Sequence, residues 1–400
     1  MVSVSEASDI IFSNLLKPGI ETVPLQRAFN RVLGEKISAD RDFPPFDRVS
    51  MDGVAIQFEV LKNGQNEFPV EFIHAAGSPQ KKLQRKNNCV EVMTGAILPE
   101  GTDTVIRYED LEIKDNVARV LNETVNAYQN VSRKGIDCRQ GDLLLQPGML
   151  LAPSEVALLA SVGKVDVRVF SLPATAIISS GDELVDVGQF PLPHQIRRSN
   201  TYAIEAGMQS LNWNANHFHF PDEKPVLLKS LEKVLSDHDV VILSGGVSKG
   251  KFDFIPKVLE ALGVKKLFHH VNQRPGKPFW FGRSADGSKT VFALPGNPVS
   301  TYMCFYRYIR PWFLKSFQVD QGNLTAELAE TFSFAPSLTY FLQVKTVSEE
   351  GKLLAYPDPG GGSGDFVNLK NVTGFLELPP QKTTFHAGEI FSYFPFRNLL

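Results

Sequence analysis

The chain has 400 residues, of which 43% are hydrophobic and 21% charged, a composition that is typical of globular proteins with roughly two to four domains. Its 41 basic and 44 acidic side chains leave a net charge of −3, which excludes binding to nucleic acid or to an anionic membrane by charge alone. Apolar runs fall short of the roughly 20 residues of a membrane-spanning helix. Glu6 and Asp9 do not fit a basic leader, and three isolated cysteines suit a reducing compartment, so we expect a cytoplasmic protein.

The N-terminal half begins with a helical pattern over residues 1–16 and then changes character. From residue 23 to 168 the pattern consists of short alternating strands, such as 88–93 and 116–121, broken by Gly, Pro and Asn. This half is therefore predicted to be β-rich, as one or two subdomains.

The residue pattern of the second half of the chain predicts alternating strands and helices. Asn200 and Asp222 are candidate N-caps of the first two helices, which follow a buried strand and a second strand respectively. The predicted strands are 174–179, 215–220, 239–243, 264–270 and 290–294, and the predicted helices are 200–210, a helix after Asp222, 256–262 and a long helix from Pro298 to about Trp312. Such alternation indicates an α/β layer with a mostly parallel sheet. After residue 317 short strands return, at 340–346 and 375–378, which suits a small barrel or sandwich.

Three loops at the carboxyl ends of these strands predict an oxyanion site, because ligands of open parallel sheets bind at that edge. Ser244-Gly245-Gly246-Val247-Ser248 would bring backbone N–H groups and hydroxyls to an anion. Arg274-Pro275-Gly276-Lys277-Pro278 would aim two cations at one oxyanion. Pro295-Gly296-Asn297-Pro298-Val299-Ser300 would open a helix with free N–H groups. Ordinary glycine turns and solvated surface charge are the alternatives for these loops.

Carboxylates accompany the predicted anion site. Asp182 and Glu183 end the first strand and Asp253 follows the Gly-rich loop, an arrangement that Mg²⁺ with phosphates prefers. Helix capping is the alternative for Asp253, and simple solvation is the alternative for Glu183. His269 and His270 should point to opposite faces of a strand, which argues against a histidine metal site.

Three N-terminal segments combine small polar residues with turn residues: 44–53, 94–99 and 135–142. In 44–53 a turn role alone would account for the Asp52-Gly53 pair. The segments 94–99 and 135–142 could line a pocket or only turn the chain, and their residues leave both interpretations open.

In order along the chain, these segments resemble the molybdopterin molybdenumtransferase family, which includes MoeA of bacteria and the E domain of gephyrin. The matching motifs are Arg31-Val32-Leu33, PPFDRVSMDGVAI at 44–56, TGAILPEGTDTVI at 94–106, RKGIDCRQGD at 133–142, SSGDELV at 179–185, SGGVSKGKFDF at 244–254, RPGKP at 274–278 and LPGNPVS at 294–300.

The resemblance implies a multidomain fold of an α/β three-layer domain, β-rich N-terminal domains and a C-terminal β-barrel. Its implied boundaries are 1–20 with 171–318 for the molybdopterin-binding α/β domain, 21–43 with 140–170 for a linking domain, 44–139 for an inserted β-rich domain and 319–400 for the barrel. It also implies a homodimer in which the α/β domain of one subunit and the N-terminal parts of the other form a cleft.

Members of the family insert molybdenum from molybdate into adenylylated molybdopterin and release AMP in a Mg²⁺-dependent step. By motif match, the implied catalytic residues are Asp52, Thr94, Asp137, Glu183, Asp253 and Lys277, with Asp253 and Asp52 also as metal ligands. The implied substrate-binding residues are Ser244, Gly245, Gly246, Ser248, Arg274, Pro278, Pro295, Asn297, Ser300 and Ser363. A molybdopterin adenylyltransferase and proteins of molybdoenzyme maturation are the implied partners.

The chain departs from the family pattern at several places: Arg274 stands in place of lysine, Lys251 in place of an acid and Gln343 in place of arginine. The hydroxyl of Ser50 is also moved by one position, and the motif after Ser363 is degraded. The alternative function is therefore a catalytically impaired carrier or scaffold that binds molybdopterin. A sister adenylyltransferase or a nucleotide pyrophosphatase is a third possibility, against which the N-terminal motifs argue.

Overall fold

The computed structural model describes residues 1–122, 124–247, 254–319 and 322–397. The chain divides into two compact units, the first comprising Met1–Gly34, Gly148–Ala152 and Val167–Leu400 and the second Glu35–Pro147 and Pro153–Asp166. Across the described residues, every helix is too short or too polar to span a bilayer.

The first unit contains a six-stranded sheet in the order β16-β13-β17-β21-β20-β18. Its strands are β13 (Thr175–Ser180), β16 (Asn216–Phe220), β17 (Val240–Ser244), β18 (Val264–His269), β20 (Trp280–Ser284) and β21 (Thr290–Leu294). The pairings of β13 with β16, β13 with β17 and β17 with β21 are parallel, whereas β20 joins β21 and β18 antiparallel. The predicted mostly parallel sheet is confirmed, but β20 was not predicted.

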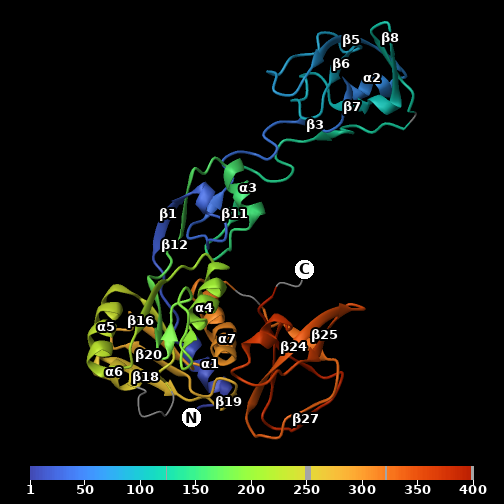
Figure 1. The fold of residues 1–400 in the computed structure, drawn as a ribbon. Helices are drawn as coiled ribbons and strands as arrows, with labels where there is room; N and C mark the ends of the chain where they lie inside the picture. The colour runs from blue at the N-terminus through green and yellow to red at the C-terminus, as the bar shows by residue number, and fades with distance from the viewer. Residues whose placement is uncertain (123, 248–253, 320–321, 398–400) are drawn as a thin grey trace. The chain divides into compact units, whose positions relative to one another are not determined.

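Alternating side chains of the sheet enter two separate cores. On β13, Ile177 packs in the core that holds α1 (Val4–Phe12), α4 (Asn200–Gln209) and α7 (Pro298–Cys304). Its neighbour Ile178 packs in the core that holds α5 (Lys224–Asp237) and α6 (Ile255–Ala261). Figure 1 shows these two groups of helices on opposite faces of the sheet. The domain is thus a three-layer α/β domain, and its N-terminal helix belongs to it.

Two helix predictions need correction. The N-cap of α5 is Glu223 and not Asp222, because Pro225 occupies an early position where the missing N–H costs nothing. The long helix predicted from Pro298 is divided into α7, a π-helical turn (Phe305–Ile309) and α8 (Arg310–Ser316). Pro311 in the first turn of α8 explains the division, since proline cannot donate to the preceding turn.

The strand prediction at the two histidines is also wrong in one respect. The rings of His269 and His270 stack with centroids 3.9 Å apart, where alternation would separate them. The cause is the backbone of His270, which leaves the extended conformation with a φ of 73°.

A closed barrel forms the C-terminal part of the first unit. Strand β24 pairs with both β25 and β26, and this closes the ring β24-β25-β22-β28-β26. The strands are β22 (Thr325–Leu328), β24 (Thr339–Glu349), β25 (Lys352–Pro357), β26 (Gly374–Leu378) and β28 (Ile390–Pro395). The short strand β19 (Gln273–Arg274) of the α/β domain pairs with β24, so a loop of one domain continues the sheet of the other.

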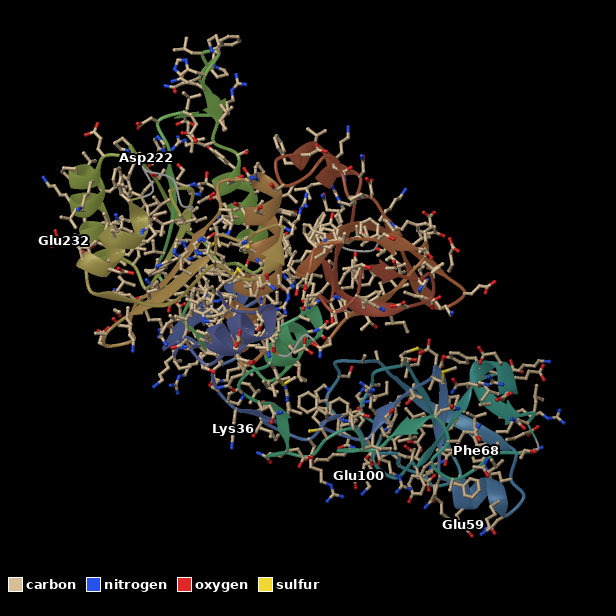
Figure 2. The ribbon with its side chains drawn as sticks, turned by 90° about the horizontal axis from the view of Figure 1, so that it is seen from below. Lys36, Glu59, Phe68, Glu100, Asp222 and Glu232 are labelled. Atoms are coloured by element: carbon tan, nitrogen blue, oxygen red, sulfur yellow. The ribbon has the colours of Figure 1, made fainter. Side chains whose placement is uncertain are left out.

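The second unit is built mainly on a six-stranded sheet in the order β7-β4-β6-β5-β9-β8. Its strands are β4 (Gly53–Ile56), β5 (Glu67–His74), β6 (Cys89–Val92), β7 (Thr104–Arg107), β8 (Leu111–Lys114) and β9 (Val117–Val120). Phe68, labelled in Figure 2, is fully buried among these strands. The unit also contains smaller pairs, among them β3 (Arg48–Val49) with β10 (Val131–Ser132) and β2 (Ile37–Ser38) with β11 (Leu143–Leu145). The predicted β-rich character is confirmed.

Candidate functional site

A cavity of about 1120 Å³ lies at the carboxyl edge of the parallel strands of the first unit. Residues at the ends of β13, β17 and β21 line it, as the sheet-edge rule for open α/β folds requires. Seven of the predicted site residues are part of its lining: Glu183, Ser244, Gly245, Gly246, Pro278, Pro295 and Asn297.

In the glycine loop after β17, Gly245 packs closely against the end of β13. Its φ is 103°, and a Cβ there would lie 2.6 Å from the carbonyl oxygen of Ser180 at the end of β13. The N–H of Gly245 donates to the carbonyl of Leu294 at 3.1 Å. This glycine therefore allows two strand ends to meet, and its own N–H is already used within the protein.

Asn200 joins two of the predicted loops. Its Nδ2 donates to Ser244 Oγ at 2.9 Å and to the carbonyl of Gly296 at 2.7 Å. The sequence indicated a capping role for Asn200, but Ser199 is the N-cap of α4. The amide of Asn200 instead fixes the spacing between the loops after β17 and β21.

The barrel contributes one wall of the cavity through the loop that contains Ser363. Asn297 Nδ2 donates to Ser363 Oγ at 2.8 Å, and the N–H of Val299 donates to the carbonyl of Ser363 at 3.1 Å. Gly364 and Phe366 of the same segment line the cavity. Two predicted residues that are far apart in the sequence thus meet at the start of α7.

The remaining predicted residues of the oxyanion pocket lie outside this lining. Arg274 and Lys277 are exposed, and the guanidinium carbon of Arg274 lies 5.8 Å from the ring centroid of Phe334 in the barrel. Ser300 is buried in the first turn of α7, with 3% of its surface exposed. The structure does not bring Arg274, Lys277 and Ser300 to the cavity with Pro278.

Acidic groups gather where β13 and β16 end. Glu183 and Asp222 line the cavity, the hydroxyl of Ser180 donates to Asp222, and the N–H of Asp222 donates to Asp182 Oδ1 at 3.2 Å. Figure 2 labels Asp222 beside the projecting segment that follows β13. These contacts place carboxylate groups at the cavity, and the predicted role of Glu183 beside phosphates stays a prediction.

In the second unit, Asp52 and Thr94 form a hydrogen-bonded pair. Asp52 Oδ1 accepts from the Thr94 N–H at 2.6 Å and from Thr94 Oγ1 at 2.8 Å. These bonds, the backbone bond first, lower the pKa of Asp52 from its usual range. Both side chains are exposed, so the pair presents an ionised carboxylate to solvent.

Asp137 lies on a different loop of the second unit and is exposed. Its N–H donates to the carbonyl of Phe43 at 3.0 Å, and the N–H of Gly135 donates to the carbonyl of Pro44. These bonds hold the segment around Asp137 against the proline-rich segment that precedes Asp52.

Two predicted residues, Ser248 and Asp253, lie outside the described residues, as does Lys251. Within the described ranges, no three His, Cys, Asp or Glu side chains converge in a way that could hold a metal ion. The predicted metal role of Asp253 and Asp52 therefore stays a prediction.

The lining residues that sequence reasoning did not assign to the site include Arg197, Arg198, Asp222 and Phe366. The two arginines lie at the end of β15 (Ile196–Arg197), which pairs in parallel with β14 (Leu184–Val185). The sequence indicated only a loop for the Gly- and Pro-rich stretch between these strands. The adjacent basic residues before Asn200 were the available signal.

Gln343, one of the departures from the family pattern, is buried in the barrel with 4% of its surface exposed. Its Nε2 donates to the carbonyl of Pro359 at 3.0 Å, at the base of the loop that carries Ser363. Gln343 thus contacts this loop from within the barrel.

Comparison with known proteins gives a consistent assignment. Family models match three successive segments: the MoeA N-terminal region (domain I and II) over residues 2–163, a "Probable molybdopterin binding domain" over 176–315 and the MoeA C-terminal region (domain IV) over 325–396. The cavity described above is formed mainly by the second of these segments.

Full-length relatives share the same arrangement. A molybdopterin molybdenumtransferase of Synechocystis is 40% identical over 397 residues, covering 98% of this chain and 100% of the relative. One of Staphylococcus epidermidis is 31% identical and covers 97% of this chain and 94% of its own length. The crystal structure of a molybdopterin biosynthesis MoeA protein from Pyrococcus horikoshii superposes with a TM-score of 0.82 at 31% identity, covering 100% of both chains. The chain is therefore a member of the molybdopterin molybdenumtransferase family.

Proposed function

We propose that this protein is a molybdopterin molybdenumtransferase of molybdenum cofactor biosynthesis. It inserts molybdenum from molybdate into adenylylated molybdopterin, with Mg²⁺-dependent release of AMP. The observation that carries the proposal is the cavity of about 1120 Å³ at the sheet edge of the segment that matches a molybdopterin-binding domain.

The size and the lining residues of the cavity suit a large anionic ligand with flat rings. Its volume is of the size that protein pockets offer to ligands larger than a single oxyanion. Phe366 is half exposed and can stack against a heteroaromatic ring, while Arg197 and Arg198 supply positive charge.

The donor chemistry also suits Mg²⁺, which binds through one or two carboxylates together with substrate phosphates. Asp52 is held ionised by Thr94, and Glu183 places a carboxylate at the cavity. In our proposal Asp52 and Asp253 hold the metal ion, which neutralises phosphate charge when it is bound. Thr94 orients Asp52, and Lys277 and Arg274 balance the charge of molybdate.

The assembly that we propose is a homodimer located in the cytoplasm. The cysteines Cys89, Cys138 and Cys304 are unbridged, which suits a reducing compartment. A molybdopterin adenylyltransferase would supply the substrate, and proteins of molybdoenzyme maturation would receive the product.

Release of AMP is the direct test. Purified protein given adenylylated molybdopterin, molybdate and Mg²⁺ should release AMP and yield active cofactor, and omission of Mg²⁺ should stop both.

Glu183→Gln should lower turnover roughly 10- to 100-fold, as loss of a charged group beside a metal or phosphate does. The matched control is Glu232→Gln, an exposed glutamate of α5 that is absent from the cavity lining. Pterin binding without AMP release would contradict the proposal and favour a carrier.

Lys277→Ala separates function from folding. The side chain of Lys277 is exposed, and its carbonyl accepts hydrogen bonds from the N–H groups of Val271 and Phe279. We therefore expect turnover to fall while the melting temperature changes by less than about 2 °C. Asp253→Ala should behave in the same way. A large drop in melting temperature for either variant would show that its side chain supports the fold instead of the reaction.

A further inference from the structure

The cavity has a charge distribution that its predicted residues do not explain. Among the described residues that line it, the cations are Arg197 and Arg198, and the acids are Glu183 and Asp222. The cations expected from the sequence, Arg274 and Lys277, are absent from the lining. Among the described lining residues, the two adjacent arginines are therefore the groups that can balance an anionic ligand in this cavity.

The guanidinium of Arg198 is held by Asp186, but one of its N–H groups has no acceptor among the described residues. One terminal nitrogen lies 2.7 Å from Asp186 Oδ2, and the N–H of Arg198 donates to the carbonyl of Val185 at 3.0 Å. Its Nε is buried and has no acceptor among the described residues. A buried guanidinium N–H without an acceptor is costly, and because this atom is covered by protein, the terminal N–H groups are the ones that can reach a ligand.

The exposure of the pair shows which partner faces the ligand. The side chain of Arg198 is 18% exposed and that of Asp186 is 53% exposed, and Asp186 is absent from the cavity lining. Asp186 therefore contacts the guanidinium from the solvent side, and Arg198 faces the cavity. Asp222, one of the two acids of the lining, already accepts a hydrogen bond from the hydroxyl of Ser180.

Arg197 and Arg198 differ in the groups that hold their side chains. Its Nε donates to the carbonyl of Gln189 at 3.0 Å, and its residue is exposed. Of the two arginines, Arg198 is thus the one with a carboxylate anchor and an unused buried donor.

We propose that Arg198, anchored by Asp186, binds the phosphoryl oxygens of the adenylylated substrate. This inference rests on the proposed function and adds a recognition residue to it. Phosphoryl groups fit because the planar guanidinium fork matches two oxygens of one phosphate, and because the cavity is far larger than a single tetrahedral anion needs.

His219 provides a reporter beside the proposed phosphoryl site. Its Nδ1 lies 2.9 Å from Ser179 Oγ, and burial first and the charge of Arg198 second lower its pKa, against the opposite effect of Asp222 and Asp182. A phosphate bound to Arg198 would offset the positive charge, so the pKa of His219 should rise.

The test is equilibrium binding of ADP, AMP and molybdate to the full-length protein. Arg198→Gln should weaken binding of ADP and AMP at least about tenfold, Arg198→Lys should retain part of the affinity, and molybdate binding should stay within about twofold. Asp186→Asn removes the anchor without touching the cavity and should weaken ADP binding by a smaller factor. The control is Lys266→Gln, because Lys266 is an exposed residue of β18 that pairs with Glu260 of α6. This variant should bind ADP as the wild type does.

Each outcome decides the inference. It is overturned if Arg198→Gln binds ADP as tightly as the wild type, if molybdate binding falls in parallel, or if the wild type binds no ADP. Should Arg198→Gln fail to fold, the wild-type His219 titration decides, since ADP must raise its pKa. Insertion activity is measured separately by AMP release, so a failure here leaves the proposed function standing.

Discussion

Asp52 shows how a single carboxylate is prepared by its neighbours. Two donors from one residue, the N–H and hydroxyl of Thr94, converge on the same oxygen, Oδ1. Hydrogen bonds to the ionised form lower a carboxyl pKa, and the other oxygen stays available for a cation or for water. Asp52 therefore keeps its charge to lower pH than an ordinary aspartate does.

Thr94→Val tests this preparation. The variant keeps the N–H donor and loses the hydroxyl, so the pKa of Asp52 should rise toward its usual value, which an NMR titration of the carboxyl carbon would measure. Because the pKa is lowered in the folded state, the interaction stabilises the fold above the ordinary carboxyl pKa and is lost as the pH falls through the lowered value. The acidic limb of the activity profile should move to higher pH in Thr94→Val.

Thr94→Ser is the matched control, because serine keeps both donors. Its Asp52 pKa and its acidic limb should coincide with those of the wild type. An unchanged pKa in Thr94→Val would mean that the N–H alone sets the ionisation.

At the scale of elements, glycine at the sheet edge controls how closely two strand ends approach. Gly245 and Gly263 both have positive φ, but only Gly245 has backbone in the way of a Cβ, since nothing lies within 4 Å at Gly263. The two positions therefore separate conformational strain from steric conflict.

Gly263→Ala should cost about 1 to 2 kcal/mol of unfolding free energy, the strain of an L-residue at positive φ. Gly245→Ala should cost more than about 3 kcal/mol or displace the loop after β17, because strain and a backbone clash add. Denaturant unfolding measures both, and equal losses in the two variants would refute the steric account of Gly245.

The elements that the sequence predicted well are those with strong local signals. The apolar runs that became β13, β17 and β21 lie inside a parallel sheet, where both faces are buried, so their hydrophobicity identifies them. Strand β20 was missed because Trp280–Ser284 contains Gly282, which reads as a break but lets the strand approach the carbonyl of Lys265. The two-residue strands β14 and β15 are too short to leave a pattern in the sequence.

The candidate site was predicted in part for a related reason. Residues at the ends of parallel strands, such as Ser244 and Pro295, are brought together by topology alone. Contacts such as Asn297 with Ser363 depend on how the barrel docks, and no local pattern encodes a partner 66 residues away. Arg198 escaped notice because its pair with Asp186 and its place in the cavity lining are set by the fold and leave no local pattern in the sequence.

For the whole molecule, the proposed homodimer makes a prediction about mixed subunits. If each catalytic cleft takes Asp52 from one subunit and Lys277 from the other, a heterodimer of Asp52→Ala with Lys277→Ala contains one intact cleft and one doubly damaged cleft. Random mixing of two inactive variants should then restore about one quarter of wild-type activity, since about half of the dimers are mixed and each has one of two sites.

Co-expression with two affinity tags would isolate the mixed dimer, whose AMP release should approach half that of the wild type. Inactive mixed dimers would show that Asp52 and Lys277 act within one subunit. A monomer by light scattering at assay concentration would remove the premise.

Helix α1 carries a consequence for how the chain is made. Its residues 4–12 leave the ribosome early, yet they pack in a core whose first strand, β13, begins at Thr175, which is 175 − 12 = 163 residues later. At about 5 to 20 residues per second, translation takes on the order of 10 to 30 s to supply that partner. A nine-residue helix is marginal alone despite its Ser3–Glu6 capping box, so this segment must wait, exposed, for the sheet it covers. Nascent chains stalled before Thr175 should therefore be good clients for chaperones that hold apolar amphipathic segments.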